Sequence, residues 1–182
     1  MSAFTKKIGV SVAVMCLAGA TALASSVHLK PPNTNPTFID QGLTLDAIGA
    51  LAGLGSGDVV VSLTATANPT ATCTNPGSGA TQPPGQNPAS VTVTGSEAIP
   101  AGEIKNGNVS FDVTTKAPTS PIPGAPGCPN SSWTETITDL AFTSAIITVQ
   151  QGGVTELTVT CTFATPTTNG PVRSNLISCQ SS

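Results

Sequence analysis

Residues 58–67 read DVVVSLTATA, and this stretch decides the fold class. Apolar side chains stand at the odd positions, from Val59 to Ala67, and a serine and two threonines stand between them. Successive side chains on a β-strand point to opposite faces of the sheet, so the stretch predicts a strand with one apolar face and one hydroxyl-lined face. Threonine suits the outer face because its branched Cβ fits the pleated surface and its hydroxyl meets water.

The same alternation recurs at residues 90–94, 108–115 and 156–162. Further strands are predicted at residues 134–142 and 144–150, a shorter one at 38–45, and one in the tail at 172–179. Residues 45–54 are small and rich in glycine, and they carry a weak helical pattern.

Two dipeptides mark tight turns between these strands, Asn106-Gly107 and Gly152-Gly153, because such residues accept the positive φ of a primed hairpin turn. Alternating strands without helical crossovers predict an all-β fold, an antiparallel β-sandwich of about seven to nine strands, immunoglobulin-like in general architecture. The Cys–Trp–Cys spacing of true immunoglobulin domains does not fit, because Trp133 closely follows Cys128, and the chain has no tyrosine.

The composition excludes several classes of protein. Charged residues make up 8% of the 182-residue chain, against about 25% in an ordinary domain, which leaves too few to coat helix surfaces. A formal net charge of −3 is opposite to the basic surface of a nucleic-acid-binding protein. A hydrophobic content of 38% with little charge is not typical of a disordered chain.

The N-terminal segment predicts export. Lys6 and Lys7 precede an apolar run of about a dozen residues, too short for the ~20 that a spanning helix needs, and Ala22-Leu23-Ala24 fits a signal-peptidase site. We therefore expect residues 1–24 to be a signal peptide, 25–36 an extended leader with little to pack, and 37–182 a single β-sandwich domain. The mature chain, without a membrane span, is expected to be secreted, either extracellular or in the cell envelope.

The cysteines support the same compartment. Removal of Cys16 with the signal leaves an even number in the exported chain, which predicts two disulfides: Cys73, Cys128, Cys161 and Cys179. Three connectivities remain open, and Cys73–Cys128 with Cys161–Cys179 is favoured. The first bridge would join two loops, and the second would fasten the C-terminal tail to a strand.

Two loops, at residues 74–89 and 117–130, are unusually rich in proline and glycine. Loops longer than about 12–15 residues are uncommon inside compact domains and are either functional or flexible. If Cys73 joins Cys128, both loops lie at one end of the domain and form one surface. The candidate partner-contact residues there are Trp133, Asn75, Asn87 and Asn130. For Trp133, packing against a disulfide is the alternative.

The residues needed for catalysis are scarce. A Ser or Cys nucleophile normally needs a histidine base, and His28 is the only histidine, close to the predicted mature N-terminus. No two of the mature cysteines are spaced like zinc ligands, and no glycine motif fits a phosphate site. Phe38, Phe111, Phe142 and Phe163 stand at apolar strand positions, which indicates core rather than sugar-stacking residues. We expect no enzyme, no cofactor and no metal.

Two functions from different classes remain. The first is a non-enzymatic structural component of a surface or matrix, which the neutral, threonine-rich surface favours. The second is an extracellular binding module, an adhesin or a carbohydrate-binding domain, that contacts a protein or glycan through its Pro/Gly-rich loops. Asn108 and Asn130 begin triplets that fit N-glycosylation. The sequence indicates nothing about self-association.

Overall fold

The structure, a computed structural model, describes residues 27–32, 35–85 and 88–182. The predicted signal peptide and Asn87 lie outside the described residues. Within these residues the fold is all-β, with two 3₁₀ turns, η1 (Ala101–Glu103) and η2 (Ser174–Leu176). The strands are β1 (His28–Leu29), β2 (Thr37–Asp40), β3 (Leu45–Ala52), β4 (Val59–Thr74), β5 (Thr81–Gln82), β6 (Val91–Ile99), β7 (Val109–Thr114), β8 (Thr134–Gln151), β9 (Val154–Phe163), β10 (Gly170–Pro171) and β11 (Ile177–Ser181).

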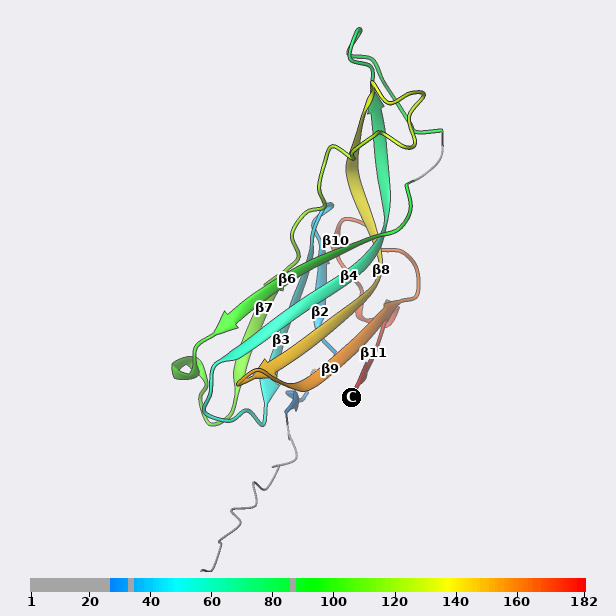
Figure 1. Cartoon of the computed structure of the whole chain (residues 1–182). Helices are drawn as coiled ribbons and strands as arrows, with labels where there is room; N and C mark the ends of the chain where they lie inside the picture. Colours follow the sequence, from blue (N-terminus) through cyan, green and yellow to red (C-terminus); the bar gives the residue numbers. More distant parts are fainter. Residues whose placement is uncertain (1–26, 33–34, 86–87) are drawn as a thin grey trace, which may run out of the picture.

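The strands form two antiparallel sheets, an arrangement consistent with a β-sandwich (Figure 1). In the first, which we call sheet A, β3 is central: β7 pairs along one side, β2 and β1 share the other, and β10 pairs with β2. In sheet B the order is β11-β9-β8-β4, and the free side of β4 is shared by β6 and β5. Among the described residues, no helix is long and apolar enough to span a membrane.

The core lies between the two sheets and is built from the apolar positions of the alternating strands. Val61, Leu63 and Ala65 of β4 are completely buried, and the residues between them are half-buried on the opposite face. The core interpretation of the four phenylalanines is confirmed, because all are buried. Phe38 of sheet A meets Phe163 of sheet B edge to face, with 5.2 Å between ring centroids.

A buried polar network also ties the sheets together. The Asp40 carboxylate at the end of β2 accepts hydrogen bonds from the Thr167 hydroxyl (2.5 Å) and the Gly42 amide (2.9 Å). The Thr167 hydroxyl accepts one from the Phe142 amide of β8 at 2.8 Å. Because Asp40 and Thr167 are both buried, these bonds replace the water that the two side chains lose on folding.

At one corner the sheets approach each other backbone to backbone. The Lys116 amide, just after β7, donates to the Thr94 carbonyl of β6 at 2.8 Å. At Gly95, an added Cβ would lie 1.9 Å from the Thr114 carbonyl oxygen. Only glycine allows so close an approach of two backbones, so this residue sets the spacing of the corner.

The longest strands, β4 and β8, pair along their whole length and extend past the two sheets (Figure 1). We call this extension the arm: residues 67–74 and 134–142 with the described parts of the loops at 75–90 and 115–133. Two register shifts interrupt the β4–β8 pairing and leave Thr143 and Thr138 without an opposing residue. Each donates its hydroxyl to a β4 carbonyl, Thr143 to Thr66 at 3.2 Å and Thr138 to Thr70 at 3.3 Å.

Several details differ from the sequence predictions. The weak helix predicted at 45–54 is wrong, because residues 45–52 form β3. Small residues have little conformational preference of their own, so pairing with neighbouring strands on both edges determines the structure of this stretch. The strand expected at 38–45 divides into β2 and β3 around a turn in which the Gln41 amide donates to the Thr44 carbonyl. The two strands expected at 134–142 and 144–150 are one, β8, continuous through its bulges.

The structure also differs from the sequence predictions near the two ends of the chain. The tail strand, expected from residue 172, begins only at Ile177, after η2. The expectation that the leader has little to pack is wrong for residues 27–29, because Val27 and Leu29 are buried and β1 pairs with β3. In the described residues, eight strands have four or more residues, within the predicted seven to nine, and β1, β5 and β10 have two each.

Candidate functional site

The end of the arm brings the two Pro/Gly-rich loops together. Cys73, the second-last residue of β4, forms a disulfide bond with Cys128 in the second loop, 55 residues further along the chain. The Gly85 amide of the first loop donates to the Gly127 carbonyl of the second at 2.8 Å. The two loops therefore lie side by side, as the favoured cysteine pairing predicted.

The second disulfide acts at the opposite side of sheet B. Cys161 of β9 and Cys179 of β11 are directly opposite each other in the strand register, with Cα atoms 4.1 Å apart, and they are bonded. The Cys161 side chain is completely buried. This bridge fastens the C-terminal strand to the sheet, which is the role the sequence favoured for it.

Three of the four candidate partner-contact residues, Asn75, Asn130 and Trp133, are described, and the structure places them at the end of the arm. Both asparagines already bond within their own loops. Asn75 and Trp133 follow and precede the paired residues Thr74 and Thr134 at the end of the β4–β8 ribbon. The Asn75 side-chain oxygen accepts hydrogen bonds from the Gly77 amide at 2.8 Å and the Ser78 amide at 3.4 Å. Such an Asx turn fixes the loop conformation from within.

Asn130 has a similar task in the second loop. Its side-chain oxygen accepts hydrogen bonds from the amide (3.0 Å) and the hydroxyl of Ser132. Its carbonyl accepts one from the Trp133 amide at 3.2 Å, and the Trp133 side chain is half-buried. The two described asparagines therefore hold the loops in shape, which leaves partner contact to other side chains of the arm.

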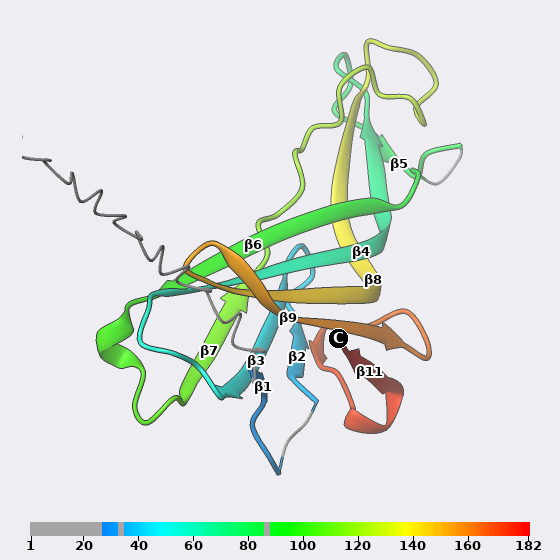
Figure 2. The same cartoon turned by 60° about the horizontal axis from the view of Figure 1, so that its bottom comes forward.

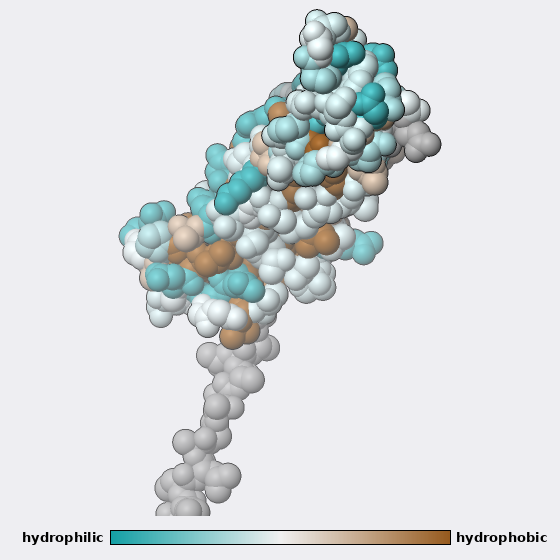
Figure 3. Space-filling view, turned by 45° about the horizontal axis from the view of Figure 1, so that its top comes forward, coloured by the Kyte–Doolittle hydropathy of each residue, from teal (hydrophilic) through white to brown (hydrophobic). Residues whose placement is uncertain are grey.

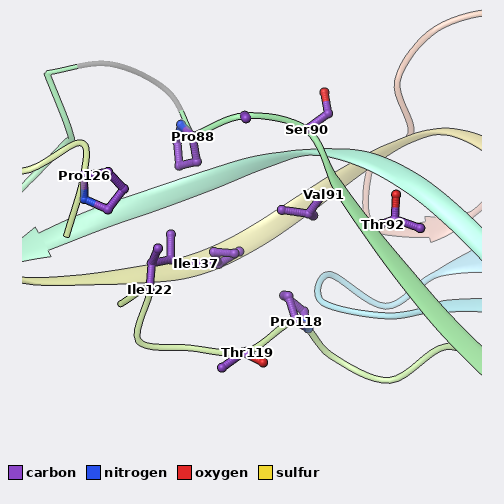
Figure 4. A pocket seen from close by; sticks show the side chains of 10 residues that line it. Pro88, Ser90, Val91, Thr92, Pro118, Thr119, Ile122, Pro126 and Ile137 are labelled. Atoms are coloured by element: carbon purple, nitrogen blue, oxygen red, sulfur yellow. The ribbon is translucent and has the colours of Figure 1, made fainter. Parts of the chain in front are cut away.

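A pocket of about 500 Å³ lies between the loops at the base of the arm (Figure 4). Its walls come from the end of the first loop and the start of β6, from the second loop, and from β8. The lining residues are Pro88, Ala89, Ser90, Val91, Thr92, Pro118, Thr119, Ile122, Pro126 and Ile137. This volume falls within the range of about 300–1,000 Å³ that ligand pockets occupy.

The chemistry of this pocket is apolar and uncharged. Among the described lining residues, three prolines, two isoleucines, an alanine and a valine supply carbon surface, and three hydroxyl side chains supply the side-chain polar atoms. Such a surface gains affinity by removing apolar area from water. None of the described lining side chains is an acid or a base.

Glu135 is a residue of the arm that the sequence analysis missed. Its side chain is completely buried; one carboxylate oxygen accepts a hydrogen bond from the Gly127 amide at 3.1 Å, and the other has no hydrogen-bond partner among the described residues. Its backbone carbonyl accepts one from the Ile122 amide at 2.6 Å, so Glu135 holds the second loop at two points. The signal was present in the sequence, because Glu135 stands two residues before Ile137, on the apolar side of the alternation.

In the part of the chain that the structure describes, no cluster of three or more His, Cys, Asp or Glu side chains is arranged to hold a metal ion. The site therefore consists of the arm, its disulfide and its apolar pocket. No protein-family model matches the chain, and neither a curated protein nor a solved structure shows significant similarity to it.

Proposed function

We propose that this chain is a secreted, non-enzymatic binding module, immunoglobulin-like in general architecture, whose arm contacts an extracellular partner. The observation that supports the proposal most directly is the pocket between the two loops, which lie side by side and are tied by the Cys73–Cys128 bridge. A pre-shaped surface loses less conformational entropy on binding than free loops would. The two disulfides are compatible with an oxidising, extracellular location.

The lining of the pocket favours a protein partner over a glycan. Sugar sites usually combine an aromatic ring for stacking with charged or amide groups for hydrogen bonds, and none of the ten lining side chains is of these kinds. An extended peptide segment with a proline, leucine or valine side chain would fill an apolar pocket and leave its own backbone facing the three hydroxyls. We therefore expect the ligand to be a neutral, apolar peptide segment of an extracellular protein.

The proposal is tested with a panel of extended peptides that carry one Pro, Leu or Val anchor, with soluble glycans as the second arm. We expect peptide binding to shift the NMR signals of Ile122 and Ile137, and Ile122→Asn to abolish the shift at Ile137. Ile104→Asn is the matched control, because Ile104 is also half-buried against the core but lies outside the pocket. Binding of glycans alone, or no shift with any peptide, would contradict the proposal.

A structural component of a surface or matrix is the second candidate. The observation that favours it is that each disulfide fastens a segment to a strand of sheet B, the second loop to β4 through Cys73 and β11 to β9 through Cys179. This function predicts that the exported protein stays with insoluble extracellular material after washing with concentrated salt. It also predicts that Ile122→Asn does not release the protein, which separates the two candidates.

A further inference from the structure

The first strand of the chain, β1, is a short segment that fills part of the edge of β3. In the strand register His28 lies opposite Ala52, and Leu29 lies opposite Leu51. The side chains of Val27 and Leu29 are buried in the core, and His28 is exposed. We call the place that β1 occupies, beside Leu51 and Ala52, the terminal slot. Two apolar side chains and a short backbone ladder hold β1 in it.

The segment between β1 and β2 is much longer than the gap that it bridges, because both strands pair along the same edge of β3. The Lys30 amide donates to the Ala50 carbonyl at 2.8 Å, and Thr37 lies opposite Ile48. These two points of β3 are two strand positions apart, which is about 7 Å. Residues 31–36 connect them, and an extended segment of this length spans about 20 Å. The connection is therefore long enough to carry β1 out of its own slot.

The connecting segment is also rich in proline. Pro31, Pro32 and Pro36 stand between the two strands. Proline fixes its own φ near about −65° and restricts the preceding residue to extended backbone, so such a segment prefers an extended course. A return to the same edge of β3 opposes this preference, whereas a course toward a second molecule follows it.

A second copy of the chain offers β1 an identical slot. The pairing with Leu51 and Ala52 and the burial of Val27 and Leu29 are the same whether β1 comes from its own chain or from another. The strand contacts therefore favour neither arrangement, and the connecting segment and the protein concentration decide between them. Exchange of an identical element in this way is a low-cost route to association.

We propose that β1 exchanges between copies of the chain, so that Val27 and Leu29 of one copy fill the terminal slot of another. The choice of a second copy as partner depends on the structure itself, because the segment that occupies the slot is the β1 of this chain. Association driven by apolar surface needs a large continuous patch, and on the face shown in Figure 3 the apolar (brown) side chains lie in separate patches. β1, blue in Figure 1, lies at the end of the molecule opposite the arm, so the inference is independent of the pocket between the loops.

The test captures β1 of one copy beside β3 of another with a disulfide. Two variants of the chain from Ser25 on, His28→Cys and Ala52→Cys, are mixed and oxidised at about 1 mM, the effective concentration that a short link provides within one chain. Opposite residues of an antiparallel pair lie within disulfide reach, so we expect a heterodimer linked between positions 28 and 52. The matched control mixes His28→Cys with Ser110→Cys, because Ser110 is exposed on β7, across β3 from β1. It should give several-fold less heterodimer.

The same two substitutions in one chain provide the second measurement. His28→Cys with Ala52→Cys should form the bridge within the chain and lock β1 in its own slot. In size-exclusion chromatography, the share of dimer should rise with concentration for the unmodified chain, and the locked variant should stay monomeric.

Melting temperatures show whether the variants fold. If His28→Cys does not, a synthetic peptide of residues 25–32 with this substitution replaces it, and Ala52→Cys should capture the peptide while Ser110→Cys should not. Equal yields in the two mixtures, or equal capture of the peptide, would overturn the proposal. Dimers that the locked variant still forms would overturn it as well, because they would show that the copies associate through another surface.

Discussion

The buried side chain of Glu135 both positions the second loop and lowers the stability of the arm. Its carboxylate lies inside the arm beside the Cys73–Cys128 bridge, and a single hydrogen bond, from the Gly127 amide, reaches it. A buried carboxyl group that accepts a single hydrogen bond loses its hydration and recovers little of it. The residue therefore holds the loop in place at a cost to the stability of the arm.

We expect Glu135→Gln to be at least as stable as the unmodified protein, because the amide oxygen can still accept from Gly127 and no charge is buried. Glu135→Ala should lose about 1–3 kcal/mol, since it leaves the Gly127 amide without a partner. Thermal melts at neutral pH measure both, with the exposed Glu103→Gln as the control. A marked loss of stability in Glu135→Gln alone would show that the charge itself is needed.

Gly95 gives a second prediction at the residue scale. Gly95→Ala should cost about 1–3 kcal/mol or prevent folding, because the new methyl group would collide with the Thr114 carbonyl and force the two backbones apart. Gly102→Ala is the control, since nothing lies within 4 Å of its Cβ position. Chemical denaturation of the two variants makes the comparison. Equal stability would refute the close approach of β6 and β7.

At the scale of elements, the arm depends on its bulges and its bridge. Thr143 and Thr138 both bond across the β4–β8 pair at the positions where the backbone ladder is interrupted. Bulges increase the local twist of a strand pair, so they re-aim the ribbon where it leaves the sandwich. The hydroxyls replace ladder bonds that the bulges remove.

Removing one such hydroxyl should therefore be measurable. Thr143→Val should lose about 1 kcal/mol, because the Thr66 carbonyl loses a partner without any change in side-chain shape. Thr148→Val, on the same strand, removes a hydroxyl that bonds to no described protein group and should change stability little. Urea titrations of both variants provide the measurement. The idea fails if the two losses are the same.

The Cys73–Cys128 bridge can be separated from the fold by paired substitution. Cys73→Ser with Cys128→Ser should lower stability by about 2–4 kcal/mol and leave the strand core folded. Amide exchange should rise in the arm, at residues 67–74 and 134–142, and stay low in β9. Cys161→Ser with Cys179→Ser is the control, because it should release β11 instead. Faster exchange throughout the molecule in the first pair would mean that the arm is needed for the core.

At the scale of the whole molecule, the alternation of side chains predicted which stretches form strands, but it did not predict how the strands are arranged in the sheets. Alternation at residues 58–67 and 156–162 predicted β4 and β9, and the cysteines indicated both bridges. The alternation of Thr64 and Thr66 predicted a hydroxyl-lined face, but the pairing register of sheet B determines which hydroxyl side chains lie opposite each other on neighbouring strands. Glycine-rich β3 was ambiguous because pairing with distant strands, not its own residues, selects its conformation.

The candidate site was predicted only in outline. The convergence of the loops followed from one favoured cysteine pairing, while the pocket required segments from three parts of the chain to meet. The asparagines were chosen as exposed polar residues, yet Asn75 and Asn130 turned out to bond within their own loops. Short-range bonds of this kind depend on a loop conformation that residue type alone does not specify.

β4 and β8 continue through their bulges from sheet B to the tip of the arm, so two paired strands connect the tip of the molecule to its body (Figure 2). A tensile force applied at the loops passes along these two strands into the centre of the sandwich. There it loads the hydrogen bonds of β4 and β8 with β6 and β9 in shear, so many bonds must break together rather than one after another. The tip of the arm and the core of the sandwich are thus connected mechanically through β4 and β8.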